Sequence, residues 1–137
     1  MYQLMYISNV VNLMDEDDLN SVLEQARIKN KKLNITGMLV YHEGAFMQIL
    51  EGQEDDVKSL MKTISDDPRH NNIEILEEVT VSERCFPSWD MAFRKLTYSD
   101  IEKYPMIEQL LANHSPEQNA KLSDVTIVFL SLIRGNY

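Results

Sequence analysis

The fold is decided by residues 35–66, which read ITGMLVYHEGAFMQILEGQEDDVKSLMKTISD. Residues 35–41 and 45–50 are rich in β-branched, aromatic and other apolar side chains and are separated by His42-Glu43-Gly44. This pattern predicts two strands joined in a short hairpin. Residues 53–66 predict a helix, because three acidic residues open the segment and the apolar side chains then recur at helical spacing, at Val57, Leu60, Met61 and Ile64. Pro68 ends this helix.

The same pattern of strand and helix extends on both sides of this stretch. Before it, residues 2–11 predict a strand, and a helix follows that starts after the acidic run 15–18 and ends near Asn30. After it, residues 73–81 and 89–96 predict two further strands. The order βαββαββ predicts an α+β, ferredoxin-like fold, with a five-stranded mixed sheet and two helices on one face.

The C-terminal segment predicts helices that cover the other face of this sheet. Pro105 suits the first turn of a short helix, and Ser115 with Gln118 suits a capping box that opens another. Residues 125–133 are almost wholly apolar, which predicts a helix buried on more than one side. We therefore divide the chain into a sheet domain, residues 1–95, and a helical cap, residues 96–137.

Composition limits the function classes. The sequence has 137 residues, which predicts one domain, and 22 acidic against 13 basic residues give a net charge of −9. An acidic chain disfavours direct binding to nucleic acid or to an anionic membrane surface. A single cysteine, Cys85, leaves no internal disulfide. Without a signal sequence or an apolar run long enough to span a membrane, we expect a cytoplasmic protein.

Enzyme motifs are missing from the sequence. It contains no G-x-S-x-G, H-E-x-x-H, P-loop or G-x-G-x-x-G pattern. The three histidines, His42, His70 and His114, are scattered and read as structural. The sequence therefore predicts neither an enzyme nor a metal site.

Polar side chains inside the predicted core strands are the more informative feature. Tyr6 lies mid-strand among apolar neighbours, and Gln48 shares a strand face with Phe46 and Leu50. A buried glutamine must satisfy both its carbonyl and its amide or lose about 1–3 kcal/mol. Asn30 adds a third polar group aimed at the same layer. Together they could hydrogen-bond one another and a buried planar ligand.

Five segments of the chain resemble the BLUF family, the blue-light sensors that use flavin. In order they are Leu4-Met5-Tyr6-Ile7-Ser8, Asn30 with 34–39, 46–52, Asp67-Pro68-Arg69-His70, and 84–91. Their order and spacing match the family over residues 1 to about 95, and the family's fold agrees with the predicted strand order. The resemblance implies a blue-light photoreceptor of the short, single-domain type.

The resemblance also implies a cofactor and roles for named residues. FAD, with FMN as an alternative, would be held non-covalently between the two helices and the sheet. Tyr6 would give an electron and then a proton to the light-excited flavin, and Gln48 would rearrange its hydrogen bonds. Trp89 and Met91 would report the change. The cofactor-binding residues would be Tyr6, Lys29, Asn30, Ile35, Phe46, Gln48, Asp67 and Arg69.

Two alternative functions stay open, and the sequence also indicates how a signal would leave the domain. The first rival is a flavin-free ferredoxin-like interaction module. The second, a small hydrolase of the acylphosphatase kind, is weaker because no arginine follows the first strand in an anion-binding loop. Since residues 96–137 leave no room for a cyclase or a phosphodiesterase, output would pass through a protein effector or an assembly change. Seven apolar residues within 125–133 predict a homodimer or larger homo-oligomer.

Overall fold

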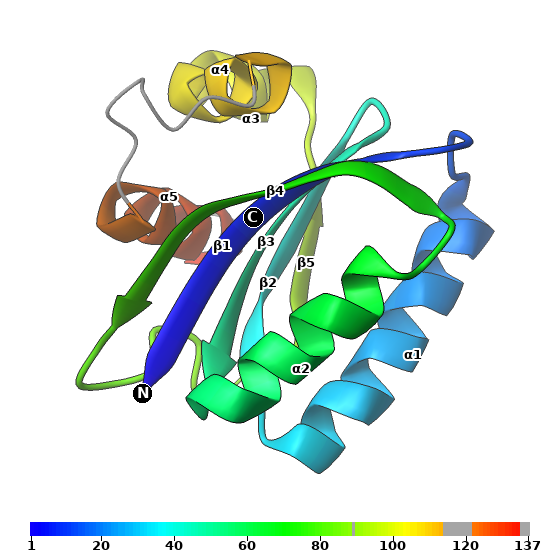
Figure 1. Ribbon diagram of the computed structural model, residues 1–137. Helices are drawn as coiled ribbons and strands as arrows, with labels where there is room; N and C mark the ends of the chain where they lie inside the picture. The colour runs from blue at the N-terminus through cyan, green and yellow to red at the C-terminus, as the bar shows by residue number, and fades with distance from the viewer. Residues whose placement is uncertain (89, 114–121, 135–137) are drawn as a thin grey trace.

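The computed structural model describes residues 1–88, 90–113 and 122–134. Its centre is a five-stranded sheet in the order β4-β1-β3-β2-β5 (Figure 1). The strands are β1 (Tyr2–Val10), β2 (Thr36–His42), β3 (Ala45–Gly52), β4 (His70–Thr80) and β5 (Ala92–Lys95). Among the described strands only β2 and β5 pair in parallel, so the sheet is mixed. The predicted ferredoxin-like α+β fold is confirmed.

The predicted hairpin forms between β2 and β3. Glu43 and Gly44 both have positive φ, 45° and 83°, as a two-residue turn between antiparallel strands requires. Gly37 allows the two strands to approach, because a Cβ at this position would lie 1.9 Å from the backbone oxygen of Ile49. These local constraints fix the register of β3, the central strand.

Helices α1 (Glu16–Leu33) and α2 (Glu54–Ser65) lie on one face of the sheet (Figure 1). The prediction that α1 ends near Asn30 is wrong, since the helix continues for another three residues. Lys31, Lys32 and Leu33 are good helix formers, and Asn34 then adopts the left-handed conformation with φ 55° that ends the helix. Asn30 therefore lies within the last turn, where its side chain is 1% exposed.

Helices α3 (Tyr98–Lys103), α4 (Pro105–Asn113) and α5 (Leu122–Arg134) cover the opposite face, as predicted (Figure 1). Alternate residues of the strands supply one side of this core, among them Met5, Ile7, Met47 and Ile49. The helices supply the other, with Ile101, Ile107, Val125, Phe129 and Leu132. Sequence analysis missed α3, although Thr97 and Asp100 form a capping box at its start.

The last strand is shorter than predicted. β5 begins at Ala92 rather than at residue 89, because the carbonyl groups of Asp90 and Met91 accept hydrogen bonds from side chains of α1 instead of joining the ladder. Trp89 lies outside the described residues, as do Ser115 and Gln118 of the predicted capping box.

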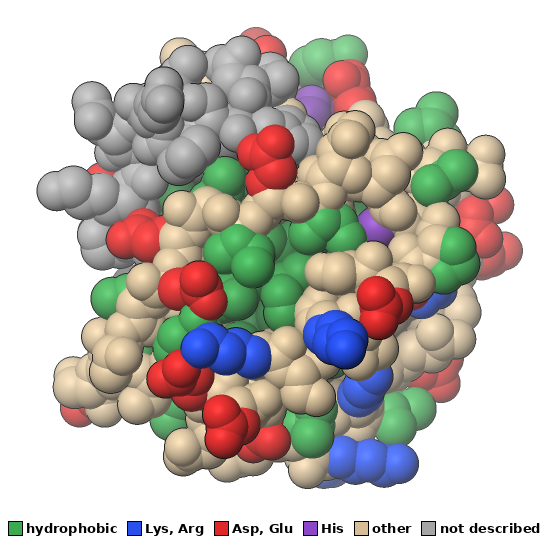
Figure 2. Space-filling model, viewed as in Figure 1, with side chains coloured by type: hydrophobic (Ala, Val, Ile, Leu, Met, Phe, Trp, Pro, Cys, Tyr) green, Lys and Arg blue, Asp and Glu red, His purple; other side chains and the backbone are tan. Residues whose placement is uncertain are grey.

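The surface over α2 and the neighbouring sheet edge carries mixed charge. Figure 2 shows acidic side chains interspersed with lysines and arginines around a hollow with apolar side chains, rather than a continuous basic face. None of the helices in the described parts of the chain has the length and hydrophobicity that a membrane span requires.

Candidate functional site

A polar pair lies at the centre of the sheet face that α1 and α2 cover. Tyr6 of β1 and Gln48 of β3 are direct cross-strand neighbours, and Leu39 of β2 lies opposite Gln48 on the other side. Because side chains of paired residues share a face, the three form a row pointing at the helices. Tyr6 is 2% exposed and Gln48 is 5% exposed.

Hydrogen bonds join this pair to Met91. The Tyr6 hydroxyl donates to Gln48 Oε1, and Gln48 Nε2 donates to Met91 Sδ at 3.2 Å. Burial, with a smaller contribution from Asp67, raises the pKa of Tyr6, so the phenol keeps its proton at neutral pH. The Gln48 amide has a second N–H for which the described residues show no acceptor, so it can donate to a ligand.

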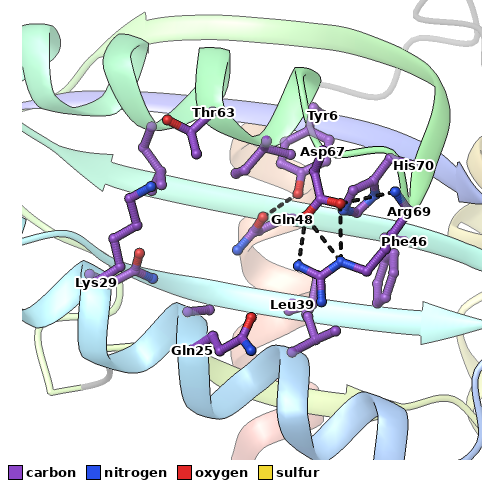
Figure 3. Close-up of a pocket in the computed structure, with 15 residues that line it drawn as sticks. Tyr6, Gln25, Lys29, Leu39, Phe46, Gln48, Thr63, Asp67, Arg69 and His70 are labelled. Carbon is purple, nitrogen blue, oxygen red and sulfur yellow. Dashed lines mark hydrogen bonds and ion pairs between the residues drawn. The ribbon is translucent and has the colours of Figure 1, made fainter.

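A cavity of about 260 Å³ opens beside this pair, between α1 and α2 (Figure 3). Val22 and Ala26 of α1 face Leu60 and Ile64 of α2 across it. The remaining lining residues, polar ones included, are Tyr6, Gln25, Lys29, Asn30, Leu39, Phe46, Gln48, Thr63, Asp67, Arg69 and His70. Apolar walls with a few convergent polar groups are typical of sites for small organic molecules.

Side chains of α1 fix the segment that leads into β5. Asn30 Nδ2 donates to the carbonyl of Asp90 at 2.9 Å, and Arg27 Nε donates to the carbonyl of Met91 at 3.0 Å. No donor among the described residues reaches the Asn30 carboxamide oxygen, and Asn30 is one of the residues that line the cavity. Asn30 can therefore accept a hydrogen bond from a ligand while it holds this segment.

The carboxylate of Glu51 anchors the other end of the same connection. It is completely buried, and each oxygen accepts two hydrogen bonds. Oε1 accepts from Thr36 Oγ1 at 2.9 Å and from the Phe86 amide at 2.6 Å. Oε2 accepts from Gln3 Nε2 at 2.9 Å and from the Cys85 amide at 2.8 Å. Glu51, which lies three residues after Gln48 in β3, thus fixes residues 85–86 to this strand.

One end of the cavity carries an ion pair and a histidine. Arg69 binds Asp67 through Nε and Nη2, the shorter contact being 2.6 Å, and these hydrogen bonds lower the pKa of Asp67. His70 Nδ1 lies 3.0 Å from Ser8 Oγ, and its ring centroid lies 5.5 Å from that of Phe46. Burial is the main cause that lowers the pKa of His70, so its neutral form is favoured.

Most of the residues singled out from sequence meet at this cavity. Tyr6, Lys29, Asn30, Phe46, Gln48, Asp67 and Arg69 all line it. Met91 does not line it but contacts Gln48 directly. Ile35 does not line it: it follows the Asn34 cap and packs, fully buried, into the core under α1 and α2, and its assignment as a cofactor-binding residue stays a prediction. Trp89 lies outside the described residues.

Sequence reasoning missed several lining residues. His70 was read as structural, but its place in the segment 67–70 beside Asp67 and Arg69 was an available signal. Gln25 and Thr63 could be found only by projecting the two helices toward each other, since each lies on a face that also meets solvent.

The cavity fits a flat ring system better than a whole dinucleotide. Its volume is just below the roughly 300–1,000 Å³ of typical small-molecule pockets. The opposed aliphatic walls suit the two faces of a ring, and the amides of Asn30 and Gln48 suit a heteroaromatic edge with alternating donors and acceptors. Two shallower hollows share residues with the cavity, one containing Lys29 and Lys32 and the other Arg69. A flexible part of a ligand whose ring lies in the cavity can extend outward through either hollow.

Comparison with protein families gives one match to the family described as sensors of blue light using FAD, over residues 1–92. The chain is 31% identical over 109 residues to the photoactivated adenylate cyclase subunit beta of Euglena longa, covering 80% of this chain but 13% of that relative. It is 34% identical over 65 residues to the blue light- and temperature-regulated antirepressor BluF of Escherichia coli, covering 45% of this chain and 16% of that relative. The chain thus spans a small part of these longer proteins.

Solved structures also match, two of them over nearly their whole length. The photo-activated state of BlsA superposes with a TM-score of 0.77 at 28% identity, over 96% of this chain and 93% of that chain. The dark state of BlrB, described as a BLUF protein, gives a TM-score of 0.74 at 32% identity, over 93% and 94%. Klebsiella pneumoniae BlrP1 with FMN and cyclic diGMP gives 0.69 at 27% identity, over 82% and 35%.

Proposed function

The chain belongs to the BLUF family of flavin-binding blue-light sensors, and from this premise we propose that Tyr6, Gln48 and Met91 carry its light reaction. A bound flavin supplies a chromophore that absorbs blue light and, once excited, accepts an electron and a proton. The observation that carries the proposal is the hydrogen-bonded chain from Tyr6 through Gln48 to Met91 beside the cavity.

Tyr6 is the electron and proton donor in this proposal. Its hydroxyl holds the transferable proton at Oη and directs it at Gln48 Oε1. Burial keeps the phenol protonated in the dark and excludes competing water. The cross-strand register supports this role, because it places the donor and the amide side by side without any loop motion.

Gln48 is the switch. Its carboxamide carries an acceptor and two donors, so rotation or tautomerisation reverses the hydrogen bonds without any change of net charge. In the dark arrangement the amide nitrogen donates to Met91 and the oxygen accepts from Tyr6. After the change, a donor of Gln48 would reach the flavin instead, and Met91 would lose its partner. Unsatisfied groups are costly in a buried site, so this local event can bias the packing of the segment before β5.

We propose FAD as the cofactor, with its ring in the cavity and Asn30, Lys29 and Phe46 among its contacts. The cavity has a volume of about 260 Å³, so the ring would occupy it and the rest of a dinucleotide would lie outside. The hollow with Lys29 and Lys32 offers two cations to the anionic phosphates. Figure 3 shows Lys29 extending from α1 toward α2 at the edge of the cavity. FMN, which is present in the BlrP1 structure, would use the same ring site.

We further propose that residues 1–95 form the sensor and that residues 96–137 transmit its state. The buried side chains of α3, α4 and α5 pack on the sheet face opposite the cavity. Asp100 of α3 binds Arg94 of β5 at 2.8 Å, so a change at Met91 has a short route to the helices. Output would pass to an effector protein or through a change in homo-oligomeric state. Ile127 of α5 is 63% exposed and could take part in such contacts.

The test is blue illumination of the purified, flavin-loaded chain and of Tyr6→Phe. The wild type should show a small, reversible red shift of flavin absorption. Tyr6→Phe should bind flavin and fold, because the ring is kept, but should show no shift. Tyr41→Phe is the matched control, since Tyr41 lies in the same core cluster but does not line the cavity. An intact shift in Tyr6→Phe would remove Tyr6 from the assigned role.

A further inference from the structure

Met91 is held from two directions by parts of the chain that are far apart in sequence. Gln48 Nε2 donates to its sulfur at 3.2 Å from the sheet, and Arg27 Nε donates to its backbone carbonyl at 3.0 Å from α1. Its side chain is 1% exposed, and regular strand structure begins only at the next residue. Without Arg27, the Met91 carbonyl would lose its side-chain partner from α1, and among the described residues Asn30 would hold this segment only through the carbonyl of Asp90.

The contact from Arg27 is specific for this carbonyl. Among the described residues, the Arg27 side chain has no acidic partner, and its one hydrogen bond goes to Met91. Arg27 does not line the cavity, whereas Asn30, one turn later, does. A long cationic side chain on an exposed helix surface loses rotamer freedom when it is fixed this way, so the contact must offset that entropy.

The hydrogen bond from Arg27 to the Met91 carbonyl, which we call the latch, matters because the contact that it supports, from Gln48 Nε2 to Met91 Sδ, is weak. A thioether sulfur is a poor acceptor, and a methionine side chain has three rotatable bonds. Gln48 can therefore keep this partner only if the Met91 backbone stays in place. We infer that Arg27 is a positioning residue for the light reaction: it holds Met91 where its sulfur accepts from Gln48 in the dark state.

This inference rests on the proposed function and predicts a direction. If the latch is removed, Met91 samples more positions, and the dark arrangement of Gln48 forms more slowly after illumination. Dark recovery should slow by about two- to tenfold, because the loss of one net hydrogen bond changes an equilibrium constant by about this factor. Flavin content should not change, because Arg27 does not line the cavity.

A pair of variants isolates the hydrogen bond. Arg27→Gln keeps an N–H at the chain position of Nε, and Arg27→Met keeps the length without a donor. Lys31→Met is the control, since Lys31 is an exposed cation one turn further along α1 that lines no described hollow and has no side-chain hydrogen bond in the described residues. We expect slow recovery in Arg27→Met, and recovery near the wild-type rate in Arg27→Gln and Lys31→Met.

The outcomes separate this inference from the proposed function. Equal recovery rates in Arg27→Met and Arg27→Gln, or faster recovery in Arg27→Met, would overturn the latch while the light reaction stands. A wild type without any reversible shift would overturn both. Amide hydrogen exchange in the dark over residues 90–95 gives a readout independent of light. It should be faster in Arg27→Met than in Arg27→Gln, and equal exchange would contradict the latch.

Discussion

Removing the Glu51 carboxylate should destabilise the fold more than removing any exposed carboxylate. The substitution Glu51→Ala leaves four donors without their acceptor: the side chains of Gln3 and Thr36 and the backbone amides of Cys85 and Phe86. Arg84 Nη1 donates to Thr36 Oγ1 and so cannot replace the lost acceptor, and the two amides belong to a buried or half-buried segment with no other acceptor among the described hydrogen bonds. The connection between β4 and β5 therefore loses its main anchor.

The magnitude follows from how the four bonds are shared. Each unsatisfied buried donor costs about 1–3 kcal/mol, so the two backbone amides alone should cost Glu51→Ala about 2–6 kcal/mol. Glu51→Gln should cost less, about 1–3 kcal/mol, the penalty of a single unsatisfied buried donor. Each carboxylate oxygen accepts one side chain and one backbone amide. The hydroxyl of Thr36 or the amide of Gln3 can reorient toward the new NH2 group, whereas a backbone N–H cannot.

Urea unfolding of the flavin-loaded chain, followed by circular dichroism, measures both free energies. Glu102→Ala on the exposed side of α3 is the control and should change stability by less than about 0.5 kcal/mol. The expected ranking is wild type and control, then Glu51→Gln, then Glu51→Ala. The reasoning is refuted if Glu51→Ala unfolds at the same urea concentration as the control.

Three further predictions concern the cavity and the tail. Gln48→Leu should keep bound flavin but lose the reversible red shift, because leucine cannot exchange donor for acceptor; a normal shift on illumination would exclude the switch. Burial is the main cause that lowers the pKa of His70, so below about pH 6.5 the unfolded state binds a proton more readily than the folded state does. The stability of the wild type should therefore decline as the pH falls through this range. His70→Gln should flatten this decline in urea unfolding at pH 7.5 and 5.5, and identical profiles would contradict it. Deletion of residues 115–137 should expose the sheet face under Val125 and Phe129 and reduce solubility or change the assembly state. Light scattering would contradict this if both forms are soluble monomers.

Sequence periodicity was enough to place the reactive pair but not the elements that hold it. The alternation of β1 and β3 puts Tyr6 and Gln48 on the helix side because the side-chain period of a strand is two. The end of α1 could not be read, since no breaker stands at Asn30 and a left-handed cap at Asn34 depends on local geometry. The start of β5 depends on tertiary hydrogen bonds from Arg27 and Asn30, which no local pattern encodes.

Some features of the site could be found only from the three-dimensional structure. His70 joins the cavity because only residues 66–69 separate α2 from β4, which brings the histidine beside Phe46 and Ser8. The anchoring role of Glu51 is invisible in sequence, where a glutamate at a strand end reads as exposed. It is buried because two backbone amides and two side chains from other segments converge on it.

Infrared difference spectroscopy of the flavin-loaded wild type, light minus dark, tests the central claim most directly. If Gln48 reverses its hydrogen bonds toward the flavin, the flavin C4 carbonyl stretch should move to lower frequency on illumination. Isotope labelling of glutamine should shift side-chain amide bands in the same difference spectrum, and both changes should reverse in the dark. A reversible red shift in absorption without any change in the carbonyl stretch or the glutamine bands would contradict the account.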